Sequence, residues 1–151
     1  MKNLFFLFFF TIAFVAANAQ QNGNEAEIDL IKKTIQSAYV EGLQNEGDTI
    51  KINQGFDPGF ELLIPGKDGK VEKYSLVEWK AKIKASLASG KLPRKGDERI
   101  SIKFNSVDVT GNAAMAKFEF YVGTKLTFVD YQFLYKFADG WKIASKIFYK
   151  Y

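Results

Sequence analysis

The side chains that could carry out chemistry in this sequence are carboxylates, tyrosines and lysines, because its 151 residues include no histidine and no cysteine. This absence excludes a Ser-His-Asp triad, histidine or thiolate metal sites, cysteine nucleophiles and disulfides. Asp68-Gly69 lacks the ligand series of a calcium loop, and Gly66-Lys67 lacks the spacing of a phosphate-binding loop. The sequence therefore predicts no metal site, no cofactor and no catalytic residue.

Two charged residues, Asp130 and Lys146, lie on strand-like segments that a turn at Asp139-Gly140 joins. With two-residue turns there and at Gly123-Thr124, strand alternation places Lys146 on the more apolar face of the sheet and Asp130 on the opposite face. An ion pair with Lys117 then explains Asp130 without catalysis. An unpaired inward lysine is costly, so Lys146 is expected to reach solvent at the rim, find a carboxylate or meet an anionic ligand. A bulge in either strand would reverse this assignment of faces.

The elements that must position these residues follow from apolar periodicity and turn residues. Apolar residues at three- and four-residue steps predict a long helix over 25–45, and a short helix is expected over 49–53. Ser75-Leu-Val-Glu78 has the form of a capping box and predicts the start of a third helix. Strand-like runs occupy residues 56–64, 70–74, 99–109, 113–122, 125–137 and 141–149. This order predicts one α+β domain over residues 25–151, with a flexible lead-in at 20–24.

The N-terminus has the three-part form of a secretory signal peptide over residues 1–19. Lys2 precedes an apolar stretch over residues 4–17, and Ala17-Asn18-Ala19 has the form of a cleavage site. The stretch is shorter than the roughly 20 residues of a membrane-spanning helix. We expect cleavage between Ala19 and Gln20 and export to the periplasm or the medium. The mature chain is expected to have no membrane span and no nucleic-acid partner, because it has no second long apolar segment and its charge is dispersed.

Several motifs carry a resemblance to a known family: Ala38-Tyr-Val-Glu-Gly42, Gly47-Asp48, Phe56-Asp57-Pro58 and the segments 108–117, 128–136 and 140–149. In these motifs and in the order of its elements, the chain resembles the nuclear transport factor 2-like superfamily, and within it the bacterial "putative lumazine-binding" branch. The resemblance implies a cone in which a curved, mostly antiparallel sheet wraps around the long N-terminal helix, with a pocket at the open end. The branch often has histidine where Asp57 stands, so no histidine-based role is transferred to that position.

The pocket implied by this resemblance would be lined by aromatic residues of the more apolar sheet face and of the helices. The apolar stripes of the helices fill much of the cone, so most of these aromatics are expected to be core residues. The candidate ligand-binding residues are Tyr39, Phe56, Phe60, Trp79, Phe118, Tyr131, Phe133, Tyr135 and Lys146.

The sequence therefore predicts an exported, non-catalytic protein that binds an acidic or aromatic small molecule. Enzymes of the superfamily, such as ketosteroid isomerase and the polyketide cyclases, use a carboxylate or histidine base inside the cone. A cofactor-free isomerase, cyclase or hydrolyase of the ketosteroid isomerase or SnoaL-like type is thus one alternative, and an acid within reach of a pocket tyrosine would favour it. The other alternative is a dimeric interaction module without a ligand pocket.

A homodimer is expected through the outer face of the sheet. That face is predicted to carry Leu126, Phe128, Leu134, Trp141, Ile143, Ile147 and Tyr149, a larger apolar patch than soluble monomers usually expose. A second copy related by a two-fold axis could cover it symmetrically. The alternative is a monomer in which the loop over residues 89–98 covers the patch.

Overall fold

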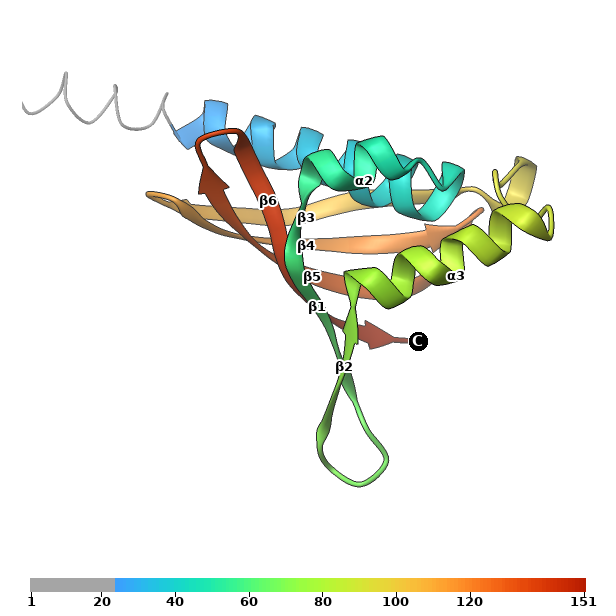
Figure 1. Ribbon diagram of the computed structural model, residues 1–151. Coiled ribbons are helices and arrows are strands. Elements are labelled where there is room, and N and C mark those ends of the chain that lie inside the picture. The colour runs from blue at the N-terminus through green and yellow to red at the C-terminus, as the bar shows by residue number, and fades with distance from the viewer. Residues whose placement is uncertain (1–23) are drawn as a thin grey trace, which may run out of the picture.

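The computed structural model describes residues 24–151, so the predicted signal peptide and most of the lead-in lie outside the described residues. The first helix is α-helical over residues 24–34 and continues as a π-helix, η1 (Ile35–Glu46) (Figure 1). Helices α2 (Thr49–Gly55) and α3 (Leu76–Ala88) and the short 3-10 turn η2 (Gly96–Glu98) follow. The strands are β1 (Phe56–Pro65), β2 (Val71–Ser75), β3 (Ile100–Thr110), β4 (Ala113–Val122), β5 (Lys125–Phe137) and β6 (Gly140–Lys150).

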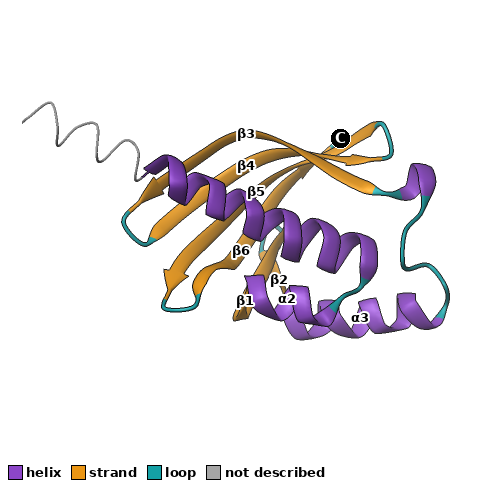
Figure 2. Cartoon of the chain, turned by 90° about the horizontal axis from the view of Figure 1, so that it is seen from above, coloured by secondary structure: helices purple, strands orange, loops and turns teal. Residues whose placement is uncertain are grey.

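The strands form one curved sheet in the order β2-β1-β6-β5-β4-β3. Among the strands of residues 24–151, β1 and β6 pair in parallel, and the other neighbours are antiparallel. The helices lie on one face of this sheet, and the first helix runs along its concave side (Figure 2). The predicted α+β cone around a long N-terminal helix is therefore confirmed. The β5–β6 hairpin turns at Ala138-Asp139 rather than at Asp139-Gly140, because Phe137 pairs with Gly140.

The helix boundaries have local causes that the sequence already contained. Gly47 has a φ of 74° and ends η1, and the amide of Asp48 donates to the carbonyl of Gly42 at 2.9 Å. The Asp48 side chain then caps α2. Ser75 and Glu78 exchange the two hydrogen bonds of a capping box at the start of α3, as predicted.

A β-bulge between β4 and β5 changes the expected register. Val122 pairs with Lys125, as a turn at Gly123-Thr124 requires, but Phe120 pairs with Phe128 instead of Thr127. One additional residue in β5 therefore turns every later side chain of that strand to the other face.

A second bulge lies in β6. Leu134 pairs with Ile143, whereas Phe133 pairs with Ser145, so Ala144 is the additional residue. The second bulge compensates for the first. The first bulge turns the side chains that were expected on the outer face of β5 toward the interior, and the second returns Lys146 to the inner face beside them.

These bulges correct the predicted faces of β5 and of the first half of β6. Five residues expected on the outer face are instead at most 3% exposed in the interior: Asp130, Gln132, Leu134, Trp141 and Ile143. Conversely, Tyr131, Phe133 and Tyr135 were expected inside, and they lie on the outer face, where Phe133 and Tyr135 are about half exposed. The exposed outer patch therefore keeps Ile147 and Tyr149 from the prediction, but its other members are Phe133, Tyr135 and Phe137.

Candidate functional site

Three buried polar side chains meet inside the cone: Tyr39 from η1, Asp130 from β5 and Lys146 from β6. The Lys146 ammonium lies 2.7 Å from Oδ2 of Asp130 and donates to the Tyr39 hydroxyl at 2.7 Å. The Tyr39 hydroxyl in turn donates to the same Oδ2 at 2.7 Å. All three residues are at most 5% exposed. Lys146 has thus found a carboxylate, which is one of the three outcomes that its inward position allowed.

The strand register brings the two charged groups together. Asp130 pairs with Phe148 and Gln132 pairs with Lys146, so the two side chains lie diagonally across neighbouring strands on one face. Oδ1 of Asp130 and both amide atoms of Gln132 have no hydrogen-bond partner within residues 24–151. Within this buried cluster, hydrogen bonds therefore join the Lys146 ammonium, the Tyr39 hydroxyl and Oδ2 of Asp130, whereas the other polar atoms have none.

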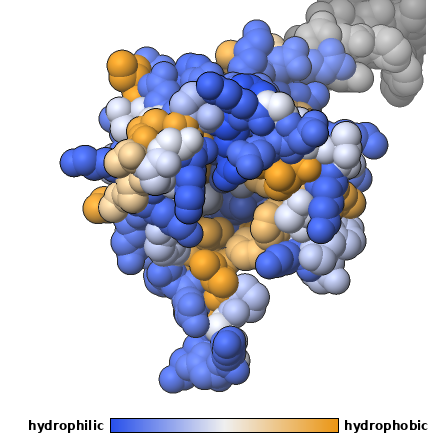
Figure 3. All heavy atoms as spheres, turned by 90° about the vertical axis from the view of Figure 1, so that its right-hand side faces the viewer, coloured by the Kyte–Doolittle hydropathy of each residue, from blue (hydrophilic) through white to orange (hydrophobic). Residues whose placement is uncertain are grey.

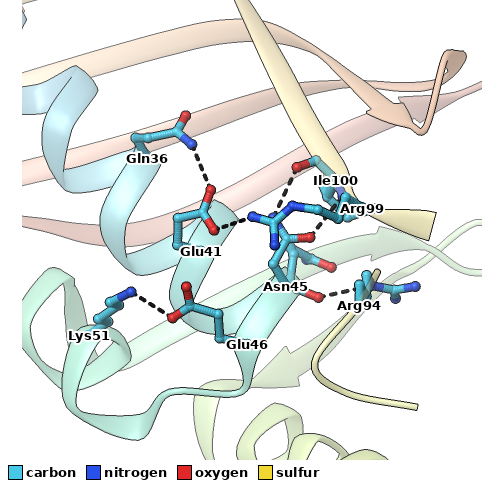
Figure 4. Close-up of polar contacts among 9 residues, drawn as sticks. Gln36, Glu41, Asn45, Glu46, Lys51, Arg94, Arg99 and Ile100 are labelled. Atoms are coloured by element: carbon cyan, nitrogen blue, oxygen red, sulfur yellow. Dashed lines mark hydrogen bonds and ion pairs between the residues drawn. The ribbon is translucent and has the colours of Figure 1, made fainter. Parts of the chain in front are cut away.

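Tyr39 is held in place by the anchoring of η1. Asn45, six residues further along the helix, is buried and bonds both backbone groups of Ile100, donating to its carbonyl at 3.0 Å and accepting from its amide at 2.8 Å. Glu41 also accepts from Arg99 at 2.8 Å (Figure 4). These contacts fix the C-terminal part of the helix against the start of β3, and with it the depth of Tyr39 in the cone.

Burial and charge act in opposite directions on the pKa values of this group. Burial raises the pKa of the Asp130 carboxyl, and Lys146 and Tyr39 oppose that rise. Burial lowers the pKa of the Lys146 ammonium, and Asp130 opposes that fall. Burial and the neighbouring Asp130 both raise the pKa of Tyr39 well above its ordinary value. The Lys146–Asp130 pair carries no net charge whichever of the two groups holds the proton.

Aromatic rings surround the Lys146 ammonium. Its nitrogen lies 4.9 Å from the ring centre of Tyr39, 5.3 Å from that of Phe148 and 5.9 Å from those of Trp79 and Phe120. The Tyr39 hydroxyl accepts a hydrogen bond from the ammonium, and ring faces attract cations, so Tyr39 and the rings of Phe148, Trp79 and Phe120 together partly replace the water that the ammonium has lost.

A cavity of about 210 Å³ opens beside this cage. Its lining residues are Tyr39, Gln44, Leu62, Trp79, Phe120, Phe128, Lys146 and Phe148. Figure 3, viewed from the side on which α3 ends, shows a hollow bordered by hydrophobic residues with hydrophilic residues around them. We call the cavity lined by these eight residues the aromatic cavity. Lys146 and Tyr39 contribute polar groups to its wall, and Asp130 lies behind them.

The predicted ligand-binding residues separate into three groups. Tyr39, Trp79 and Lys146 line the aromatic cavity. Phe56, Phe60 and Phe118 are buried in the hydrophobic core, at most 2% exposed, and do not line that cavity. Tyr131, Phe133 and Tyr135 lie on the outer face because of the bulge in β5, so the expectation that they line the pocket is wrong.

Sequence reasoning missed Asp130 as an interior residue, and it placed Phe128, a cavity residue, on the outer face. The interior lysine was the available signal. A buried ammonium needs a carboxylate partner, and only a shifted register of β5 turns Asp130 toward Lys146.

Other acidic residues have structural roles. Asp57 accepts from the amide of Gly59 at 2.8 Å, a local side-chain to backbone hydrogen bond typical of aspartate in turns. No group of three acidic side chains that could hold a metal ion occurs within the described part of the chain.

Among residues 24–151, no helix is both long enough and apolar enough to cross a membrane.

Comparison with known protein families shows the family to which the chain belongs. The sequence profile of the family described as "Putative lumazine-binding" matches residues 26–149. The chain belongs to this family. Comparison with curated proteins finds no match.

Solved structures share the fold of this family member at low sequence identity. An NTF2-like protein of unknown function from Shewanella baltica is 19% identical, with a TM-score of 0.63, over 83% of this chain and 94% of that chain. An NTF2-like protein of unknown function from Silicibacter pomeroyi is 18% identical, with a TM-score of 0.61, over 87% of this chain and 98% of that chain. These similarities establish the nuclear transport factor 2-like fold.

Proposed function

We propose that the protein binds a small, flat, largely apolar molecule in the aromatic cavity, with an uncharged acceptor such as a carbonyl oxygen directed at Lys146. The observation that carries this proposal is that Lys146 lines the cavity while its charge is balanced by Asp130 behind it. The family description, which names a small aromatic ligand, supports the same class of molecule.

The hydrogen-bond capacity of Lys146 explains the preference for an acceptor. An ammonium has three N–H groups, and Asp130 and Tyr39 use two of them. The third can serve a ligand in the cavity that Lys146 lines. A carbonyl oxygen fits this group better than an anion, because the Lys146–Asp130 pair offers no net positive charge.

A matched pair of probes tests this proposal. We expect 2-acetylnaphthalene to bind about tenfold more tightly than 2-isopropenylnaphthalene, which has the same shape but no carbonyl, since a hydrogen bond from a charged donor contributes about 1.5 kcal/mol. In the Asp130→Asn/Lys146→Met double variant this preference should disappear while the hydrocarbon still binds. Equilibrium dialysis measures both affinities. Equal affinities in the unmodified protein, or no binding of either probe, would contradict the proposal.

A second candidate function, proton transfer without a cofactor, is favoured by the position of Asp130 2.7 Å from the Tyr39 hydroxyl inside the cone. A carboxylate whose pKa is raised can accept a proton from a carbon atom next to a carbonyl group. We rank binding above catalysis because Asp130 does not line the cavity and already holds Lys146 and Tyr39. Deuterium exchange into the acetyl group of 2-acetylnaphthalene that is lost in the Asp130→Asn/Lys146→Met double variant, while that variant still binds 2-isopropenylnaphthalene, would reverse this ranking.

We also propose that the protein is exported and that it forms a homodimer. Export rests on the signal-peptide pattern of residues 1–19, and a mature chain that begins at Gln20 by intact mass would support it.

The dimer rests on the exposed apolar residues of the outer face, which are Phe133, Tyr135, Phe137, Ile147 and Tyr149.

A further inference from the structure

A second hollow, of about 420 Å³, adjoins the aromatic cavity and shares Gln44 and Trp79 with it. Its lining includes three cations, Lys82, Lys91 and Arg94, against one carboxylate, Glu98. We call it the basic hollow. The aromatic cavity is mostly apolar, whereas the basic hollow next to it carries excess positive charge.

The cations of the basic hollow are available to a ligand. Within residues 24–151, no carboxylate lies within 4.0 Å of the charged nitrogens of Lys82, Lys91 or Arg94. Arg94 is also held in place, because its Nε donates to the carbonyl of Gln44 at 2.9 Å and its amide to that of Asn45 at 2.8 Å. These bonds leave the two terminal nitrogens of its guanidinium free to bind an oxyanion.

We propose that the ligand is a small amphipathic acid, with a carbonyl at one end in the aromatic cavity and a carboxylate at the other end in the basic hollow. This inference rests on the proposed function and adds the charged end of the ligand. The buried pair at Lys146 and Asp130 is neutral, so it does not attract an anion. Lys82, Lys91 and Arg94 have no carboxylate partner within the described part of the chain, so they do attract an anion. An anionic ligand at Lys146 was one of three alternatives from the sequence, and this proposal places the acidic group in the basic hollow instead.

The test compares 6-acetyl-2-naphthoate with its uncharged amide, 6-acetyl-2-naphthamide. Both present an acetyl group for Lys146. They have the same shape at the far end, where the acid carries a negative charge and the amide is neutral with an NH2 group in place of one oxygen. We expect the acid to bind about tenfold more tightly than the amide at low ionic strength, and about threefold more tightly at 0.5 M NaCl, because Lys82 and Lys91 are exposed and Arg94 is only half-buried, so salt screens their charges.

Two double variants test whether the preference for the acid comes from the cations of the basic hollow. Lys82→Gln/Lys91→Gln should lower the acid-to-amide preference to about twofold and leave the affinity for the amide unchanged. Lys84→Gln/Lys95→Gln removes the same charge from exposed neighbours that do not line the hollow, and should leave the preference near its original value. Arg94 is retained in both because it holds Gln44.

The outcomes separate this inference from the proposed function. Equal binding of acid and amide, with both bound, would overturn the inference and leave the proposed function standing. If the two double variants lose the preference for the acid over the amide equally, the inference is also overturned. The preference would then come from the overall positive charge of this region and not from the cations of the basic hollow. If neither probe binds and 2-acetylnaphthalene does not bind, the proposed function fails and this inference fails with it.

Discussion

Replacing Lys146 by methionine is expected to lower the free energy of unfolding by about 3–5 kcal/mol at pH 7. Methionine has a similar volume, so the loss comes from Asp130, which is left as a buried carboxylate with the Tyr39 hydroxyl as its hydrogen-bond partner. Asp130→Asn should be similarly destabilising, since it leaves the Lys146 ammonium buried without a counter-ion. Urea unfolding followed by circular dichroism measures both changes.

The Asp130→Asn/Lys146→Met double variant is the control for this prediction. It removes both charges together, and the asparagine can still accept from Tyr39. We expect it to be more stable than either single variant, with a strong coupling energy between the two sites. Additive losses would show that Asp130 and Lys146 do not interact in solution and would contradict the register of β5.

Ile143→Glu is expected to unfold the protein, with a loss of more than about 4 kcal/mol. Ile143 is completely buried on the inner face of β6, and the substitution puts an acidic group in the core without a partner. Ile147→Glu makes the same change four residues later, on the outer face, where the side chain is 42% exposed. That variant should remain folded, and thermal unfolding distinguishes the two.

The same pair of variants bears on the proposed dimer. If a second copy covers the outer face, Ile147→Glu should convert a dimer into a folded monomer, which light scattering at tens of micromolar would detect. An unmodified protein that is already monomeric at that concentration would contradict the dimer. A folded Ile143→Glu variant would contradict the inner placement of that residue.

The sequence was sufficient to predict most of the fold, because its signals are local. Gly47 with Asp48 and the Ser75–Glu78 capping box lie where two helices begin or end, and turn residues such as Gly123-Thr124 separate the strands. Each of these signals acts over a few residues, so the elements could be delimited without knowledge of their neighbours.

The candidate site was predicted only in part, because its composition depends on the two bulges. A bulge adds one residue to a strand without a clear local pattern, and it reverses every side chain beyond it. Helix periodicity placed Tyr39 and Trp79 inside the cone, and the bulges do not change that. Lys146 was placed on the inner face correctly because the second bulge returns it to that face. Asp130 was missed because it follows the first bulge.

The most direct test of ligand binding beside Lys146 uses the two tryptophans, observed through their indole N–H signals by nuclear magnetic resonance during titration with 2-acetylnaphthalene. Trp79 lines the aromatic cavity, whereas the indole of Trp141 donates to Glu27 at 2.7 Å and lies outside it. We predict a saturable shift of the Trp79 signal and an unchanged Trp141 signal. An unchanged Trp79 signal, or equal shifts of both, would contradict binding in the aromatic cavity.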